Sequence, residues 1–225
     1  GGGGHTLQPL KLAESGAQGY ARALAILDAP ARARLYGEGL LRERGDYRAE
    51  DPLIALMADA PARSGLDAAQ YADLKFWLPG DILTKVDRTS MAVGLEARVP
   101  FMDVELMRLS ARIPEHYKLN GSVTKSVLKN AMARYLPRDL LHRKKTGFGA
   151  PLRTWIQEDL HDVIQYFLGP ERVSSRGIFK SSQVQRILAE NAAGTRDHAY
   201  LIYALVNLEL WMQSFLDEPG VEITL

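Results

Sequence analysis

The sequence contains no cysteine. This absence excludes disulfide bonds, thiolate metal sites and cysteine nucleophiles, and it fits a cytoplasmic protein without requiring one. The chain also lacks a strong charge of either sign, because 28 Lys and Arg residues against 27 Asp and Glu residues give a formal net charge of +1. A dedicated nucleic-acid-binding protein should carry a clear basic excess, so we predict no nucleic-acid partner.

Long hydrophobic runs are missing as well. The most apolar stretch, residues 199–212, is interrupted by Asn207 and Glu209. It is also shorter than the roughly 20 apolar residues that cross a bilayer. We therefore predict a buried core helix there and no membrane partner. Residues 1–5 follow no signal-peptide pattern, and we interpret them as a linker, a tag or the edge of a longer chain.

Several motifs of known chemistry are absent. The chain contains no G-x-x-x-x-G-K-[ST] phosphate loop, no G-x-G-x-x-G dinucleotide loop and no G-x-S-x-G nucleophile elbow. Its five histidines are scattered, with no H-x-x-x-H pair and no acidic cluster beside them. The sequence therefore predicts no metal ligands.

What the sequence does contain is recurrent helix punctuation by capping residues, prolines and glycines. Strand signals are scarce, and only residues 221–225 alternate convincingly. We predict an all-α chain, with one helical domain over residues 6–225 that is long enough to bury a substantial core. The predicted helices cover about 17–28, 30–44, Asp67 to a stop at Pro79-Gly80, Asp81 onward, Asp103 to Pro114, 122–136, Pro151 to Gly169, Ser181 to Gly194, and 197–215.

The predicted helix from Asp81 gathers charge on one side. Asp81, Lys85 and Arg88 fall at i, i+4 and i+7, with Asp87 close by. One interpretation is a solvated face whose Asp–Lys pair contributes a few tenths of a kcal/mol. The other is an acid and two cations that line a cleft and order a phosphate or a carboxylate.

Arg98 stands in an apolar setting, between Ala97 and Val99. Arginine in such surroundings needs an acidic or carbonyl partner when it is buried. We expect Arg98 to be partly buried and to join two helices through Glu96 or Asp103.

A second charged feature is the stretch HRKKTGFGAP, residues 142–151. Its consecutive cations Arg143, Lys144 and Lys145 create a positive potential that suits phosphate or pyrophosphate oxygens. The glycines on either side of Phe148 let the backbone approach a ligand or turn at positive φ. The alternative is a solvated basic turn that Phe148 anchors to the core.

A family resemblance is carried by two blocks in order, LPGDILTKVDRTSMAVGLEARVPFMD and LNGSVTKSVLKNAMARYLPRDLLHRKKTGFGAPLRTW. From about Leu78 to Trp155 the chain resembles the C-terminal part of the synthetase domain of glutamine-hydrolysing asparagine synthetases, the asparagine synthetase B-like amidotransferases. Related β-lactam synthetases and lasso-peptide cyclases share that domain. The resemblance implies the helical C-terminal portion of an α/β synthetase domain with an adenine-nucleotide α-hydrolase-like (PP-loop ATPase) fold.

The resemblance also implies an activity. Members of this family use ATP and Mg²⁺ to adenylate a carboxylate, usually that of aspartate, and release pyrophosphate. Ammonia from a glutaminase domain then gives the amide. Lys145 matches the lysine of the family's R-x-K element and is expected to be catalytic. Roles in binding the nucleotide are expected for Asp81, Lys85, Asp87, Arg88, Arg143 and Lys144.

Parts of the family pattern are not in this sequence. The S-G-G-x-D-S pyrophosphate loop, the G-G-D-E-L-F-type acidic loop and the glutaminase domain are absent. We therefore expect a C-terminal fragment that is inactive alone, with an exposed apolar patch beside the Asp81–Arg88 helix. Such a patch promotes self-association, and a homodimer is one expected form. The alternative is a non-catalytic helical binding or scaffold module that keeps the fold.

Overall fold

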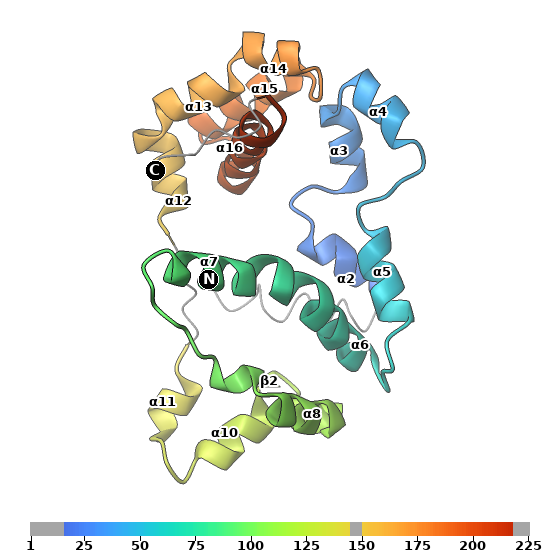
Figure 1. The fold of residues 1–225 in the computed structure, drawn as a ribbon, viewed down its shortest axis with the longest axis vertical. Coiled ribbons are helices and arrows are strands. Elements are labelled where there is room, and N and C mark those ends of the chain that lie inside the picture. The colour runs from blue at the N-terminus through green and yellow to red at the C-terminus, as the bar shows by residue number, and fades with distance from the viewer. Residues whose placement is uncertain (1–15, 145–149, 218–225) are drawn as a thin grey trace. The chain divides into compact units, whose positions relative to one another are not determined.

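The computed structural model describes residues 16–144 and 150–217, which are mostly helical (Figure 1). The all-α prediction is therefore confirmed for these ranges. The chain divides into two compact units. Unit 1 consists of Gly1–Leu24 and Arg48–Thr146, and unit 2 consists of Ala25–Tyr47 and Gly147–Leu225. The single domain over residues 6–225 stays a prediction.

Unit 1 has a small buried core where α2, α5 and α6 pack together. No residue of the elements from η1 to α9 is buried. The elements are α2 (Ala17–Leu24), α5 (Asp51–Ala58), α6 (Gly65–Ala72), the π-helix η1 (Asp73–Leu83), α7 (Thr84–Met91), the 3₁₀ turn η2 (Pro100–Met102), α8 (Val104–Arg112), α9 (Glu115–Lys118), β1 (Leu119–Asn120), β2 (Val123–Thr124), α10 (Ser126–Met132) and α11 (Arg138–His142). The core residues are Tyr20, Ala21, Leu53, Met57, Ala69 and Ala72.

The chain stays helical through Pro79, where the sequence predicted a stop. The elements α6, η1 and α7 follow one another without a break from Gly65 to Met91, as Figure 1 shows. A proline conflicts with an α-helix because it lacks an N–H and its ring meets the carbonyl of residue i−4. The i→i+5 hydrogen bonds of η1 are a local adjustment that accommodates it. The Pro79 carbonyl accepts a hydrogen bond from the Thr84 hydroxyl at 2.6 Å.

The start of this helical run also differs from the prediction. Ser64, not Asp67, caps α6, and its hydroxyl accepts a hydrogen bond from the Asp67 N–H at 3.2 Å. The Asp67 carboxylate instead accepts a hydrogen bond from Lys118 Nζ at 2.8 Å and lies 3.5 Å from Arg63 Nε. Burial raises the pKa of Asp67, but the hydrogen bond and charge of Lys118 outweigh it and hold the pKa below its ordinary value. The pair ties α9 to α6.

A short hairpin replaces the beginning of the helix predicted over 122–136. Strands β1 and β2 are antiparallel, with Leu119 opposite Thr124. Gly121 at the turn has a φ of +57°, which favours glycine. Lys125 follows with a φ of 56°, so α10 begins only at Ser126.

Unit 2 packs around α16, and the predicted core helix at 199–212 is confirmed. Its elements are α3 (Ala29–Leu35), α4 (Glu38–Arg44), α12 (Leu152–Thr154), the π-helix η3 (Trp155–Asp159), α13 (His161–Leu168), α14 (Pro170–Arg176), α15 (Ser181–Ala192), α16 (Ala199–Met212) and the π-helix η4 (Gln213–Asp217). The buried core includes Leu35, Leu168, Val184, Ile202 and Leu205. The strand predicted at 221–225 lies outside the described residues.

Three helix ends in unit 2 differ from expectation. Pro151 is the N-cap of α12 rather than a residue of its first turn. The helix predicted to run on from it breaks at Leu160, whose φ is −103° and ψ 16°. Lys180, not Ser181, is the N-cap of α15, and the Ser181 hydroxyl donates to the Pro170 carbonyl at 3.3 Å.

Glu209 interrupts the apolar sequence of α16 because it is an ion-pair residue of unit 2. Its side chain is only 6% exposed, and Arg176 donates to its two oxygens at 2.7 and 3.1 Å. Arg176 also donates to both oxygens of Asp217, at 2.7 and 2.6 Å. The hydrogen bonds to Asp217 and Glu209 raise the pKa of Arg176. This arginine therefore joins α14 to α16 and η4.

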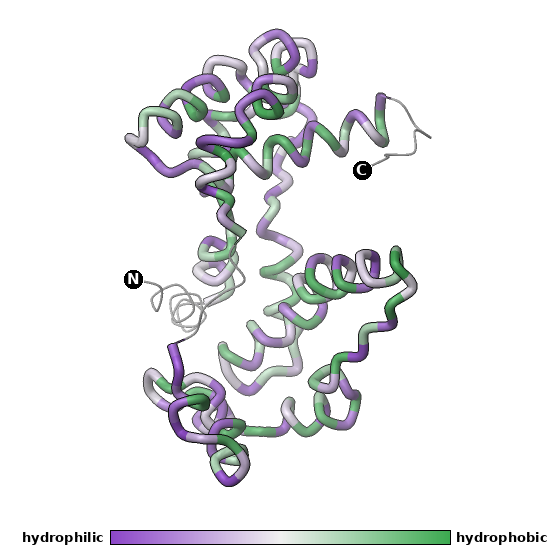
Figure 2. The backbone as a smooth tube through the Cα atoms, turned by 90° about the vertical axis from the view of Figure 1, so that its left-hand side faces the viewer, coloured by the Kyte–Doolittle hydropathy of each residue, from purple (hydrophilic) through white to green (hydrophobic). Residues whose placement is uncertain are grey.

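Hydrophobic and hydrophilic residues alternate along the helices in Figure 2. Among the described helices, none is long and apolar enough to cross a bilayer.

Candidate functional site

The predicted charged face lies at the end of η1 and along α7. Asp81 belongs to η1, whereas Lys85, Asp87 and Arg88 belong to α7, and all four residues are exposed. Lys85 Nζ donates to Asp81 Oδ1 at 3.2 Å, and the two side chains are 60% and 49% exposed. An ion pair this exposed contributes about 0–1 kcal/mol. The pair therefore orients Lys85 more than it stabilises the helix.

Among the residues that the structure describes, two members of this face have no counter-ion. Within residues 16–144 and 150–217, no salt bridge involves Asp87 or Arg88. Exposed and unpaired charges on a helix that already carries an Asp–Lys pair are available to a ligand. Spacing in the sequence predicted which residues share this face, and the structure adds which of them are paired.

Large apolar side chains are exposed along the same stretch, as expected beside the Asp81–Arg88 helix. Monomeric soluble proteins rarely expose extended apolar surface, and such surface marks a site of interaction. The exposed side chains between η1 and α8 are Leu74, Phe76, Trp77, Val86, Met91, Val93, Leu95, Val99, Phe101, Val104, Leu106 and Leu109.

Arg98 is not buried, which corrects the expectation from its apolar neighbours. Its side chain is 84% exposed, and its Nε donates to Glu96 Oε1 at 2.9 Å. Residues 95–99 form no helix or strand, and all five are exposed. Asp103 does not bind Arg98 but caps α8, accepting from the Leu106 N–H at 3.0 Å.

The basic stretch begins directly after α11. Arg143 is the C-cap of that helix, and both Arg143 and Lys144 are exposed. The salt bridges of the described chain include neither residue, and no hydrogen bond joins them to the charged face of α7. Lys145, the predicted catalytic residue, lies outside the described residues, as does the rest of 145–149. Its role stays a prediction.

Sequence reasoning missed the contact that holds the start of η1. The Tyr20 hydroxyl, from α2, lies 2.9 and 2.8 Å from the two carboxylate oxygens of Asp73, to which it donates. Burial, followed by the bond to Asp73, raises the pKa of Tyr20. Burial also raises the pKa of Asp73, against the lowering effect of the bond from Tyr20. No spacing pattern reveals this pair, because its members are 53 positions apart.

A second missed contact fixes the helix that follows the basic stretch. Arg153 of α12 donates to Asp197, just before α16, and its guanidinium lies 5.4 Å from the Tyr200 ring centroid. Asp197 also accepts from the Ala199 N–H at 3.2 Å. The hydrogen bond from Arg153 holds the pKa of Asp197 below its usual range.

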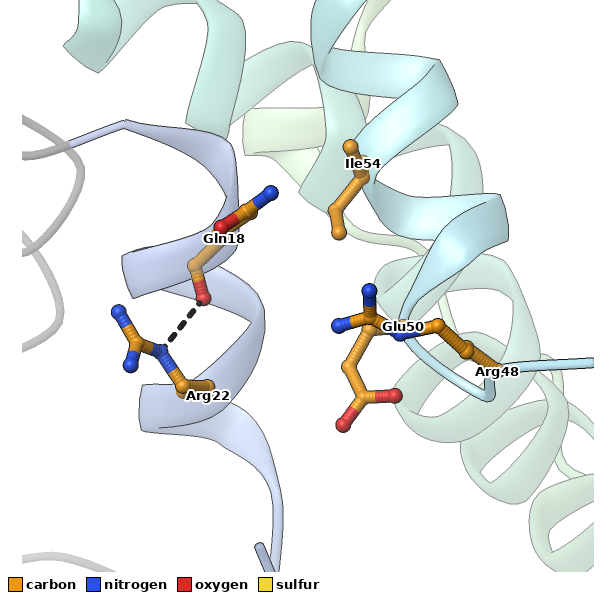
Figure 3. Close-up of a pocket in the computed structure, with 5 residues that line it drawn as sticks. All are labelled: Gln18, Arg22, Arg48, Glu50 and Ile54. Atoms are coloured by element: carbon orange, nitrogen blue, oxygen red, sulfur yellow. Dashed lines mark hydrogen bonds between the residues drawn. The ribbon is translucent and has the colours of Figure 1, made fainter. Parts of the chain in front are cut away.

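A small pocket lies between α2 and the start of α5 (Figure 3). Its volume is about 90 Å³, well below the roughly 300–1,000 Å³ of small-molecule sites. None of the predicted site residues is in its lining, which is Gln18, Arg22, Arg48, Glu50 and Ile54. We therefore do not assign it to a nucleotide.

No group of three or more His, Asp or Glu residues in the described ranges is arranged to hold a metal ion. The cations of the candidate site suit phosphate oxygens, whereas its two carboxylates, Asp81 and Asp87, do not make a cation site by themselves.

Comparison with known proteins gives one consistent similarity. The sequence model of the asparagine synthase family matches residues 5–213. A putative glutamine-hydrolyzing asparagine synthetase of Mycobacterium tuberculosis is 31% identical over 195 residues, which cover 84% of this chain and 30% of that protein. Asparagine synthetase [glutamine-hydrolyzing] 1 of Bacillus subtilis is 28% identical over 153 residues, covering 68% of this chain and 24% of that protein. The chain thus spans less than a third of these relatives. No solved structure matches it significantly.

Proposed function

We propose that this chain, which belongs to the asparagine synthase family, carries the helical C-terminal part of an ATP-dependent, carbon–nitrogen bond-forming ligase site. The reaction has two steps. A carboxylate oxygen of the acceptor, aspartate or a related acid, attacks the α-phosphorus of ATP, and pyrophosphate leaves. Ammonia released from glutamine then attacks the acyl carbon, loses a proton and displaces AMP.

The observation that carries this proposal is a set of exposed cations, at positions expected to bind the nucleotide, that have no counter-ion among the described residues. Arg88, Arg143 and Lys144 have no ion-pair partner in the described chain. Negative charge develops on the leaving pyrophosphate, and fixed cations beside it lower the barrier electrostatically. In this proposal Lys145 supplies the charge nearest to the reacting phosphate, and Asp81 orients Lys85 toward the same ligand.

The exposed apolar side chains support a second part of the proposal, that this chain is a fragment of the working site. The surface along η1, α7 and α8 is covered, in this view, by the α/β nucleotide-binding portion of a PP-loop type synthetase domain. The chain alone is then inactive. Mg²⁺ is expected with the nucleotide, and we propose that its ligands lie in that other portion. A cytoplasmic location and a homodimer are further proposals.

One observation favours a second candidate function. The pair between Asp81 and Lys85 is what a solvated helix face would show. If Asp87 and Arg88 also bind no ligand, the chain is a non-catalytic helical binding or scaffold module that kept the family fold.

ATP–pyrophosphate exchange with aspartate and Mg²⁺ distinguishes the two. The assay is run on this chain alone, on the longer protein expected to contain it, and on Lys145→Ala and Lys180→Ala variants of the longer protein. Lys180 is an exposed lysine at the N-cap of α15, and its backbone N–H, which Lys180→Ala keeps, donates to the Leu35 carbonyl, so it serves as the matched control. The proposal expects exchange only in the longer protein, lost with Lys145→Ala and kept with Lys180→Ala. Exchange that survives Lys145→Ala, or no exchange with any carboxylic acid, contradicts it.

A further inference from the structure

We infer that Tyr20 is a positioning residue, whose hydrogen bond to Asp73 sets the direction in which η1 and α7 present Asp81, Lys85 and Arg88. The effect of Tyr20 on enzyme turnover that we predict below rests on the proposed function. The anchoring itself rests on geometry alone and is tested separately.

The anchor joins two distant parts of unit 1. Tyr20 is 4% exposed, and its hydroxyl donates to both oxygens of Asp73, the first residue of η1. A buried hydroxyl and a half-buried carboxylate each need a partner, because leaving either unsatisfied is unfavourable. Since Tyr20 comes from another helix, the bond fixes the orientation of Asp73 about the helix axis as well as its position.

Along the helical run from α6 to α7, no residue after Ala72 is buried. Ala69 and Ala72 belong to the core of unit 1, whereas no residue of η1 or α7 is buried. The side-chain hydrogen bonds described farther along this run are local, such as Thr84 to Pro79 and Lys85 to Asp81. The helical run is therefore held at one end, and Asp73 is the last residue that the core fixes.

The π geometry makes the orientation at Asp73 important. Each residue of an α-helix turns the chain by about 100°. The i→i+5 bonds of η1 add a residue to each hydrogen-bonded ring, and π segments are frequent at functional sites. A change of one residue in the register of η1 would turn α7 by about 100° and point Lys85 and Arg88 elsewhere. A π-helix that begins at an anchored residue keeps one register.

The first test is regional amide hydrogen exchange in this chain by itself, in which no residue of η1 or α7 is buried. Tyr20→Phe is compared with Tyr71→Phe, because Tyr71 is a partly exposed tyrosine of α6 whose hydroxyl has no described hydrogen bond. We expect Tyr20→Phe to speed exchange about tenfold or more in residues 74–91, with no change in unit 2. Tyr71→Phe should leave these rates as they are. Equal rates in the two variants, or no change in Tyr20→Phe, overturn the inference.

A second variant keeps the test decisive if Tyr20→Phe does not fold. Asp73→Asn retains an oxygen that accepts from Tyr20 but removes the charge. It should keep protection of residues 74–91 close to that of the unaltered protein. Rapid exchange in folded Asp73→Asn would mean that the hydrogen bond is not what holds η1.

Turnover supplies a second readout. A smaller folded fraction lowers kcat alone, whereas misdirected cations also raise KM for ATP. We expect Tyr20→Phe to lower kcat/KM for ATP about tenfold to a hundredfold, with part of the loss in KM. A loss confined to kcat points to stability and contradicts a positioning role. If the unaltered protein shows no exchange of pyrophosphate, the proposed function fails, and hydrogen exchange still decides whether Tyr20 is the anchor.

Discussion

Arg176→Met tests the buried ion pair of unit 2. The substitution keeps the aliphatic stem and removes the guanidinium that binds both oxygens of Glu209, a side chain only 6% exposed. Removing one partner of a buried pair costs about 3–5 kcal/mol, because the other charge stays buried without compensation. Arg172 remains 3.8 Å from Glu209 and gives partial compensation. We therefore expect a loss of about 3 kcal/mol in the free energy of unfolding.

The assay is urea unfolding followed by the fluorescence of Trp211, which lies on α16 close to Glu209. Trp77 and Trp155 are replaced by Phe so that the signal reports α16 alone. The control is Arg186→Ala, which breaks a partly exposed i,i+4 pair with Glu190, whose carboxylate keeps its contact with His198 at 2.8 Å, and it should cost less than about 1 kcal/mol.

The double variant Arg176→Met/Glu209→Leu separates loss of the pair from loss of the arginine's packing. Replacing both charges by apolar side chains removes the uncompensated carboxylate, so most of the lost stability should return. The reasoning is refuted if Arg176→Met is as stable as Arg186→Ala. It is also refuted if the double variant is less stable than Arg176→Met.

Two further predictions concern stability. Lys118→Met should cost about 3 kcal/mol at pH 6, because Lys118 and Asp67 are only 13% and 12% exposed. The folded-state pKa of Asp67 lies below its ordinary value of 3.8. The ion pair with Lys118 therefore stabilises the fold above pH 3.8, and this stabilisation is lost as the pH falls through the folded-state pKa. Urea unfolding at pH 6 and pH 3 should show the smaller cost at pH 3; an equal cost would refute the role of Asp67. In thermal unfolding, Gly37→Ala should destabilise unit 2, because its Cβ would lie 2.5 Å from the Gly177 carbonyl oxygen. The control Gly39→Ala has open space around its Cβ and should be neutral or stabilising. Equal unfolding midpoints for the two variants would contradict the close approach of Gly37 to Gly177.

Local features of the fold followed from the sequence. The capping of α8 by Asp103 and the core helix at 199–212 depend on neighbours within a few positions, so spacing and residue type predicted both. Pro79 misled the prediction, because a π segment lets a helix pass a residue that normally ends it. The hairpin was missed because it is only two residues per strand, although Asn120-Gly121 is a recognised turn signal.

In the candidate site, too, contacts within one helix could be predicted from the sequence and contacts between helices could not. The face with Asp81 and Lys85 was predictable, because i,i+4 neighbours meet on any helix. The bonds from Tyr20 to Asp73 and from Arg153 to Asp197 were not, since they join positions 53 and 44 residues apart. Such pairs depend on how helices pack, and residue spacing along one element carries no information about that.

The most direct test of the central claim is ATP–pyrophosphate exchange by the longer protein carrying Arg88→Ala, with Arg186→Ala as the control. Arg88 is exposed on α7 without a described counter-ion, whereas Arg186 is exposed on α15 and lies 3.4 Å from Glu190. If the α7 face binds the phosphates, Arg88→Ala lowers exchange about tenfold or more and Arg186→Ala leaves it unchanged. Equal activity of the two variants would mean that the α7 face is solvated surface and not part of a ligase site.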